Sequence, residues 1–154
     1  MPRPPPTRPT DAELAILRVL WSLGPATVRQ VHERLNRDRP GRPAGYTTVL
    51  KLMQIMADRG LVRRDESRRS HVYHAVATEQ RTQRRLVSDL LDRVFGGSAR
   101  ALVQQALSVT AASPEELREI RDLLDTFDAS RPLDAARRPA KHPNESNPSK
   151  GGPR

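Results

Sequence analysis

The spacing of hydrophobic residues changes twice along this chain of 154 residues, and this change is what most constrains its fold. Up to Gly60, apolar side chains recur every three or four residues, which is the period of an amphipathic helix. Residues 61–65 and 71–76 then read as two short strands around a polar turn, and the helical period returns from Thr78. The sequence therefore predicts helices, a single β-hairpin, and helices again.

Two capping boxes locate the first helices. Thr10 precedes Glu13, and Thr27 precedes Gln30, by the three residues at which each side chain satisfies a free backbone donor of the first turn. A loop rich in proline and glycine separates the second helix from the third, which stops at Gly60. The expected helices span residues 11–22, 28–36 and 46–59.

The third helix has two chemically different faces. At about 100° per residue, its large apolar side chains gather on one side, while Leu50 and Ile55 lie on the borders. The opposite side is small, hydrogen-bonding and slightly basic. Its members are Thr47, Lys51 and Gln54, with Thr48 on the flank.

Three further helices are expected over 79–95, 98–108 and 113–128. Helices this short enclose little core alone, so their wide apolar stripes must be covered by something. Two alternatives are packing against the front half of the same chain and pairing with a second copy, of which we favour the homodimer. The residues predicted to form the dimer contact are Leu86, Leu90, Leu91, Val94, Leu102, Val103, Ile120 and Leu124.

The net charge of +9 is unevenly distributed. Residues 1–9 carry +2, residues 10–78 carry +5, residues 79–128 carry −2, and residues 129–154 carry +4. Ten of the 14 prolines lie in the two terminal segments, which we expect to be disordered. A basic front half joined to an acidic rear half favours a polyanion-binding domain, residues 10–78, linked to a different module, residues 79–128.

Several protein classes do not fit the sequence. No apolar run approaches the ~20 residues of a membrane span, and the N-terminus does not resemble a secretory signal, so we expect a cytoplasmic protein without membrane insertion. Cysteine is absent from the sequence, and His71 and His74 are spaced to point to opposite faces of a strand, so no metal site or cofactor is expected. No phosphate-binding loop, zinc-protease helix or nucleophile elbow occurs, so we do not expect an enzyme.

Three helices followed by a β-hairpin is the element order of a winged helix-turn-helix, in which the third helix enters the major groove of DNA. Thr47, Thr48, Lys51 and Gln54 are suited to base edges, which require donors and acceptors. The remaining predicted contacts, to the DNA backbone, are Tyr46, Arg68 and Arg69, the two arginines being at the hairpin tip.

A set of short segments extends this interpretation to a family. They are Ala12-Glu13-Leu14, Val19-Leu20-Trp21, Ala26-Thr27-Val28-Arg29-Gln30-Val31, Gly45-Tyr46-Thr47-Thr48-Val49, Gly60-Leu61-Val62, Phe95-Gly96-Gly97, Leu102-Val103 and Glu116-Leu117-Arg118-Glu119-Ile120-Arg121. With them, the segment from Thr10 to Leu124 resembles the BlaI/MecI/CopY family of penicillinase-type repressors. The resemblance covers about three quarters of the chain.

The resemblance implies a cytoplasmic bacterial repressor that binds inverted repeats as a homodimer, with Thr48 at a DNA-contacting position. In the β-lactam branch of the family, a membrane sensor metalloprotease triggers cleavage of the repressor, and such a protease is a possible partner here. The family's scissile Asn–Phe pair aligns with Gln105-Ala106, and the cysteine cluster of the copper branch is absent.

The sequence thus predicts a mainly α protein with a small β-hairpin, made of an N-terminal winged helix-turn-helix and a C-terminal three-helix dimerisation domain. Its expected function is that of a repressor reading an inverted-repeat operator, in a resistance or stress-response regulon. The alternative is a winged-helix protein-interaction adaptor without sequence-specific DNA binding, which the apolar Leu50 and Ile55 beside the recognition face favour.

Overall fold

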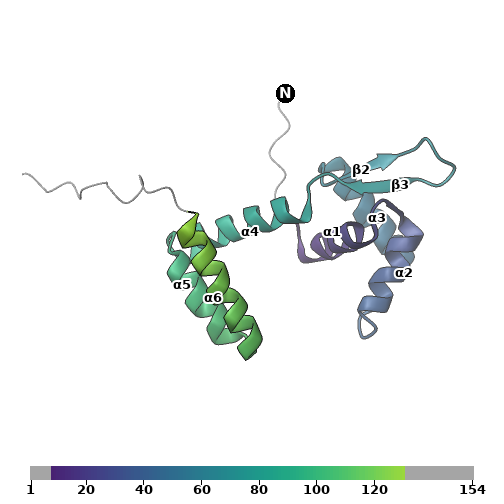
Figure 1. Ribbon diagram of the computed structural model, residues 1–154. Helices are drawn as coiled ribbons and strands as arrows, with labels where there is room; N and C mark the ends of the chain where they lie inside the picture. The colour runs from purple at the N-terminus through teal and green to yellow at the C-terminus, as the bar shows by residue number, and fades with distance from the viewer. Residues whose placement is uncertain (1–7, 131–154) are drawn as a thin grey trace, which may run out of the picture. The chain divides into compact units, whose positions relative to one another are not determined.

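The computed structural model describes residues 8–130, which form six helices and a three-stranded antiparallel sheet (Figure 1). The chain divides after Val103 into two compact units, and the boundary falls inside a helix. The terminal segments predicted to be disordered lie, apart from their innermost residues, outside the described residues. The predicted fold class, mainly helical with a small sheet, is confirmed.

The first three helices begin where the capping signals place them. In α1 (Asp11–Leu23) and α2 (Val28–Asp38) both predicted capping boxes form, with Thr10 N donating to Glu13 Oε2 over 2.8 Å and Thr27 N donating to Gln30 Oε1 over 2.9 Å. The third helix, α3 (Tyr46–Asp58), follows the predicted loop. The helix limits differ from the expected ones by at most two residues.

The sheet contains one strand more than the sequence predicts. Strands β2 (Val62–Asp65) and β3 (Val72–Ala75) form the expected hairpin, in which Arg64 is opposite Tyr73. The additional strand β1 (Ala26–Thr27) pairs with the other edge of β3, so that the strand order is β1-β3-β2. Two residues are too few to show an alternating pattern, and β1 is held by its pairing rather than by its own sequence.

The core of the first unit lies between the three helices and the sheet. Ile16 of α1, Val31 of α2 and Met53 of α3 are almost completely buried, as is Tyr73 of β3. Each such side chain contributes roughly 1.5–3 kcal/mol through removal of apolar surface from water. Trp21 is partly buried and packs against the edge of this core, where its indole N–H donates to the carbonyl of Ala77 over 2.9 Å.

The remaining helices are α4 (Glu79–Val94), α5 (Ala99–Val109) and α6 (Pro114–Ala129). Thr78 caps α4 and Ser113 caps α6 through their side chains. Gly97, at φ +81°, follows the end of α4 in a left-handed conformation that suits glycine, and its N–H bonds back to the carbonyl of Leu91 over 2.9 Å. No residue within these three helices is buried, in contrast to α1, α2 and α3.

Candidate nucleic-acid interface

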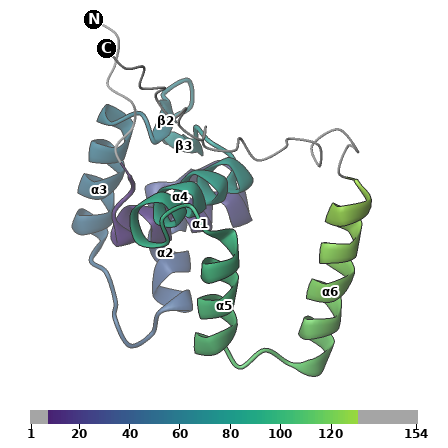
Figure 2. The same cartoon turned by 90° about the vertical axis from the view of Figure 1, so that its left-hand side faces the viewer.

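The two faces of α3 differ in burial as the sequence predicts. Val49, Met53 and Met56 are at most 1 % exposed, and they fix the helix against α1, α2 and β2. The predicted base-reading residues Thr47, Thr48, Lys51 and Gln54 are all exposed on the other side. Tyr46, at the start of the helix, is also exposed. The first unit therefore presents a polar helical face with donors and acceptors along its length. Figure 2 shows α3 at one side of this unit.

The two apolar residues bordering this face have different environments. Leu50 is half-buried and contacts the core, so it belongs to the packing of the domain. Ile55 is 41 % exposed and remains an apolar side chain on the rim of the polar face. Of these two residues, only Ile55 is an exposed apolar side chain, which is the property that favours a protein-interaction surface.

A hydrogen-bonded clamp holds the loop that leads into α3. Asn36 of α2 accepts from the Ala44 N–H over 2.8 Å and donates to the Ala44 carbonyl over 3.1 Å. That carbonyl also lies 2.9 Å from Nε2 of His32, whose ring meets the Tyr46 ring edge-on at a centroid distance of 5.7 Å. The clamp therefore fixes the backbone two residues before α3 begins.

The sequence interpretation missed this clamp. His32 is half-buried and its ring bonds to the loop, although its own place in the sequence marks it only as a residue of the helix surface. A usable signal was present: His32 and Asn36 are four residues apart, on one helical face, immediately before a loop whose polar backbone needs partners.

The N-terminus of α3 has free backbone donors. Its N-cap residue, Gly45, has no side chain to accept from the first turn, unlike Thr10 and Thr27 at the preceding helices. The N–H groups of the first turn and the positive end of the helix dipole are therefore open to an anion approaching this end of α3.

The other end of α3 is tied to α1 by an ion pair. Arg59, which caps α3, donates to both carboxylate oxygens of Glu13, whose side chain is only 3 % exposed. Burial alone would raise the pKa of Glu13, but the hydrogen bonds from Arg59 and from the Thr10 backbone outweigh it, so that the pKa lies below its usual value. The carboxylate is thus ionised and shared between a helix cap and an interhelical contact.

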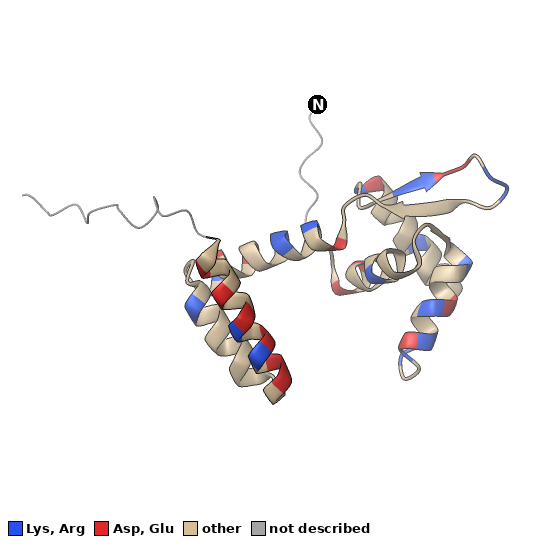
Figure 3. Ribbon diagram, viewed as in Figure 1, with Lys and Arg blue, Asp and Glu red and all other residues tan. Residues whose placement is uncertain are grey.

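The hairpin carries cations along β2 and at its tip (Figure 3). Asp65 accepts from the backbone N–H of Ser67 over 2.9 Å, and hydrogen bonds from Ser67 lower the pKa of that carboxyl. Arg64 pairs with Glu66, which raises the pKa of its guanidinium. Beyond this ordered turn, the predicted phosphate contacts Arg68 and Arg69 are exposed, with no ion pair to any residue from 8 to 130.

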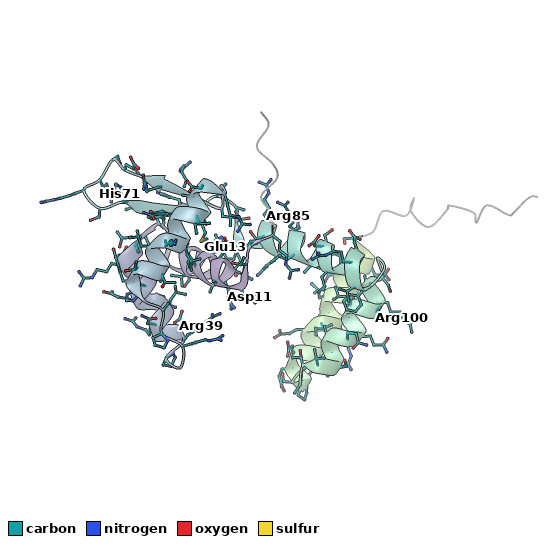
Figure 4. All side chains as sticks on the ribbon, turned by 180° about the vertical axis from the view of Figure 1, so that it is seen from behind. Asp11, Glu13, Arg39, His71, Arg85 and Arg100 are labelled. Atoms are coloured by element: carbon teal, nitrogen blue, oxygen red, sulfur yellow. The ribbon has the colours of Figure 1, made fainter. Side chains whose placement is uncertain are left out.

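The two histidines of the hairpin lie at different places along it. His71 lies at the tip end of the hairpin (Figure 4), whereas His74 is within β3 opposite Arg63. Among residues 8–130 no group of three or more side chains of the metal-binding types comes together. No helix in this range is long and apolar enough to cross a membrane.

The predicted dimerisation residues fall into two classes of exposure. Those that are half-buried are Leu86, Leu91, Leu102 and Ile120, and those that are exposed are Leu90, Val94, Val103 and Leu124. Five further apolar side chains are exposed that the prediction did not include, namely Val87, Leu107, Val109, Leu123 and Phe127, the last at 68 %. The apolar stripes of α4, α5 and α6 are thus largely uncovered in one chain.

Comparison with known proteins agrees with this arrangement. Residues 9–126 match the family model described as the penicillinase repressor. The chain is 34 % identical over 129 residues to proteins named transcriptional regulator BlaI from two strains of Mycobacterium tuberculosis, covering 82 % of this chain and 91 % of each relative. The chain belongs to the penicillinase repressor family of DNA-binding transcriptional repressors, which are not enzymes.

Proposed function

We propose that this protein represses transcription as a homodimer that binds an inverted-repeat operator, with α3 of each subunit in the major groove. The observation that carries the proposal is the polar face of α3, since a helix whose back is buried in a core presents only that face to a partner. The proposed DNA-binding domain is residues 10–78, and the proposed dimerisation domain is residues 79–128.

The side chains of the α3 face have the chemistry that base recognition needs. Lys51 donates to guanine O6 and N7, Gln54 pairs with adenine through one donor and one acceptor, and threonine methyl and hydroxyl groups suit thymine methyls and base edges. In this arrangement Thr47, Thr48, Lys51 and Gln54 read the sequence. Tyr46 contacts the sugar–phosphate backbone beside the free N–H groups of the first turn.

The hairpin supplies a second class of contact. Arg68 and Arg69 project from a turn ordered by Asp65 and Ser67, and their guanidinium groups are free to approach phosphates. Such contacts fix the register of the protein on DNA without reading bases.

Dimerisation accounts for the uncovered apolar surface of α4, α5 and α6. An exposed apolar stripe on three consecutive helices costs free energy in water, and pairing with a second copy removes it. A two-fold dimer also presents two α3 helices to two half-sites, as an inverted repeat requires. The net charge of −2 on residues 79–128 is consistent with a module that stays away from DNA.

The biological setting is inferred from the family resemblance. We place the regulon among genes of antibiotic resistance or stress response and the protein in the cytoplasm, with a membrane sensor metalloprotease as a candidate upstream partner. The position corresponding to the family's cleavage site holds Gln105-Ala106 within α5, so a protease with another sequence preference is required.

A second candidate function, that of a protein-interaction adaptor, is favoured by the exposure of Ile55. A gel shift with DNA from upstream of the gene distinguishes the two. A folded dimer that shifts no DNA at low salt would support the adaptor.

The direct test of base reading replaces Lys51 by alanine. Lys51→Ala should weaken binding to the operator more than binding to random-sequence DNA, by roughly 1–3 kcal/mol in the difference. Arg100→Ala removes the same charge from α5 and serves as the control, with both affinities unchanged. An equal loss on operator and random DNA would mean that Lys51 contacts only phosphate.

A further inference from the structure

The basic side chains of the first unit fall into two groups, those that form an ion pair with a carboxylate and those that do not. Arg29 pairs with Glu33 over 3.2 Å and Arg34 with Asp38 over 3.1 Å, and Arg59 and Arg64 also have carboxylate partners. Across residues 8–78, the cations of α3 and the hairpin that lack an ion pair are Lys51, Arg63, Arg68 and Arg69. A second unpaired group is separate from these: Arg37, Arg39 and Arg42 at the end of α2 and in the following loop, with Arg18 on α1.

Three of these arginines line one hollow. Arg39 and Arg42 of the loop and Arg18 of α1 line a depression of about 620 Å³, whose lining also includes Leu14 and whose single acidic residue is Asp11. Three guanidinium groups and one carboxylate give the lining of this hollow a net positive charge, while Arg18 and Arg39 also line a neighbouring hollow that contains Asp38 and Glu79. Planar guanidinium forks bind phosphate and carboxylate oxygens, and an anion entering here would be stabilised.

The loop that carries Arg39 and Arg42 is held in place. The Arg42 N–H donates to the Arg39 carbonyl over 3.1 Å, and Pro40 and Pro43 each fix their own φ. At its end, Ala44 is bound by Asn36 and His32. The two guanidinium groups therefore project from a backbone with a fixed relation to the start of α3.

This loop and the hairpin lie at opposite ends of α3 (Figures 1 and 2). The loop enters the helix at Tyr46, and the hairpin leaves it after Asp58, so about 20 Å of helix separates them. A major groove about 12 Å wide is bordered by one phosphate backbone on each side. A helix in that groove has one phosphate backbone on each side, so groups beyond its two ends can contact opposite backbones.

We propose that Arg39 and Arg42 form a second phosphate-binding site, which holds the DNA backbone across the major groove from the backbone held by the hairpin. The inference rests on the proposed function and adds a partner surface to it. Together with Arg68 and Arg69, this site contacts phosphates beyond both ends of α3. These two contacts fix the tilt of the helix in the groove. Neither arginine reads bases, so both contribute equally to operator and non-specific DNA.

The first test is the salt dependence of binding to a random-sequence duplex, which needs no operator. Each phosphate contact adds about 0.9 to the slope of log K against log salt concentration. The Arg39→Gln, Arg42→Gln double variant of the full chain should lower this slope by about two units. The Arg100→Gln, Arg121→Gln variant removes the same charge from α5 and α6 and should leave the slope unchanged.

The second test locates the contacts by ethylation interference on an operator fragment. The Arg39→Gln, Arg42→Gln variant should lose interference at phosphates on one side of each half-site, and an Arg68→Gln, Arg69→Gln variant should lose it on the other side. An unchanged slope, or loss of the same phosphates in both variants, would overturn the second site. If the unaltered protein binds no duplex at low salt, the proposed function itself fails. That result is distinguishable from failure of the second site alone, in which the unaltered protein binds DNA but the slope of the variant is unchanged.

Discussion

The carboxylate of Glu13, in the first turn of α1, accepts hydrogen bonds from the guanidinium of Arg59 at the end of α3. The same carboxylate accepts from the backbone N–H of Thr10 over 2.8 Å, and Arg59 also donates to the Arg8 carbonyl over 3.3 Å. One buried side chain thus closes the capping box of α1 and sets where the C-terminal end of α3 lies against it.

Removing the charge of Glu13 should destabilise the first unit. Glu13→Gln removes the buried carboxylate charge to which Arg59 donates and should lower the free energy of unfolding by about 2–3 kcal/mol, less than for a fully buried pair because Arg59 is partly exposed. Urea denaturation followed by circular dichroism measures the change. The Glu13→Gln, Arg59→Gln double variant should recover part of the loss, and strictly additive losses would show that the pair does not couple.

The same pair predicts a loss of stability in acid. Because the folded-state pKa of Glu13 is lowered, its contribution to stability is complete above about pH 4.5, the ordinary value of the group, and is lost as the pH falls through the folded-state pKa. The difference in unfolding free energy between the unaltered protein and Glu13→Gln should therefore be constant near neutral pH and shrink as the pH falls below about 4.5. A difference that is independent of pH would exclude this account.

Asn36 should matter for operator binding as well as for stability. Asn36→Ala removes both hydrogen bonds to Ala44 and should cost about 1–3 kcal/mol of stability, because the loop before α3 loses its backbone partners. Hydrogen exchange should show loss of protection at the Ala44 N–H. Asn36→Asp keeps the acceptor for that N–H and should restore its protection and part of the operator affinity. Equal operator affinity for all three proteins would mean that the clamp does not position α3.

The parts of the fold that local signals specify were predictable. Thr10 with Glu13 and Thr27 with Gln30 form the two capping boxes that begin α1 and α2, and the apolar positions of α3 separate its buried face from its polar one. Capping and periodicity are determined within one or two turns of chain, so they can be read without knowing the tertiary structure.

The features that the sequence did not predict depend on contacts between residues that are far apart in the sequence. Glu13 is predicted as a cap, but its bond to Arg59 joins residues 46 positions apart. Strand β1 exists because Ala26 meets Tyr73, and the role of His32 depends on where the following loop turns back. The arginines around the 620 Å³ hollow come from α1 and from a loop, and only the tertiary fold brings them together.

The apolar stripe of α6 gives a test of the dimer. Leu124 is exposed in one chain, and burial against a second copy would make a charge there costly, so Leu124→Glu should raise the dimer dissociation constant by at least about 100-fold. Thr126→Glu adds the same charge on the opposite side of α6 and should leave the dimer intact. Sedimentation velocity across a concentration series measures both, and circular dichroism verifies that the helices persist.

Because two half-sites need two linked α3 helices, the monomeric variant should bind one half-site with unchanged affinity and lose its preference for the inverted repeat. A protein that sediments as a monomer before any substitution would contradict the dimer.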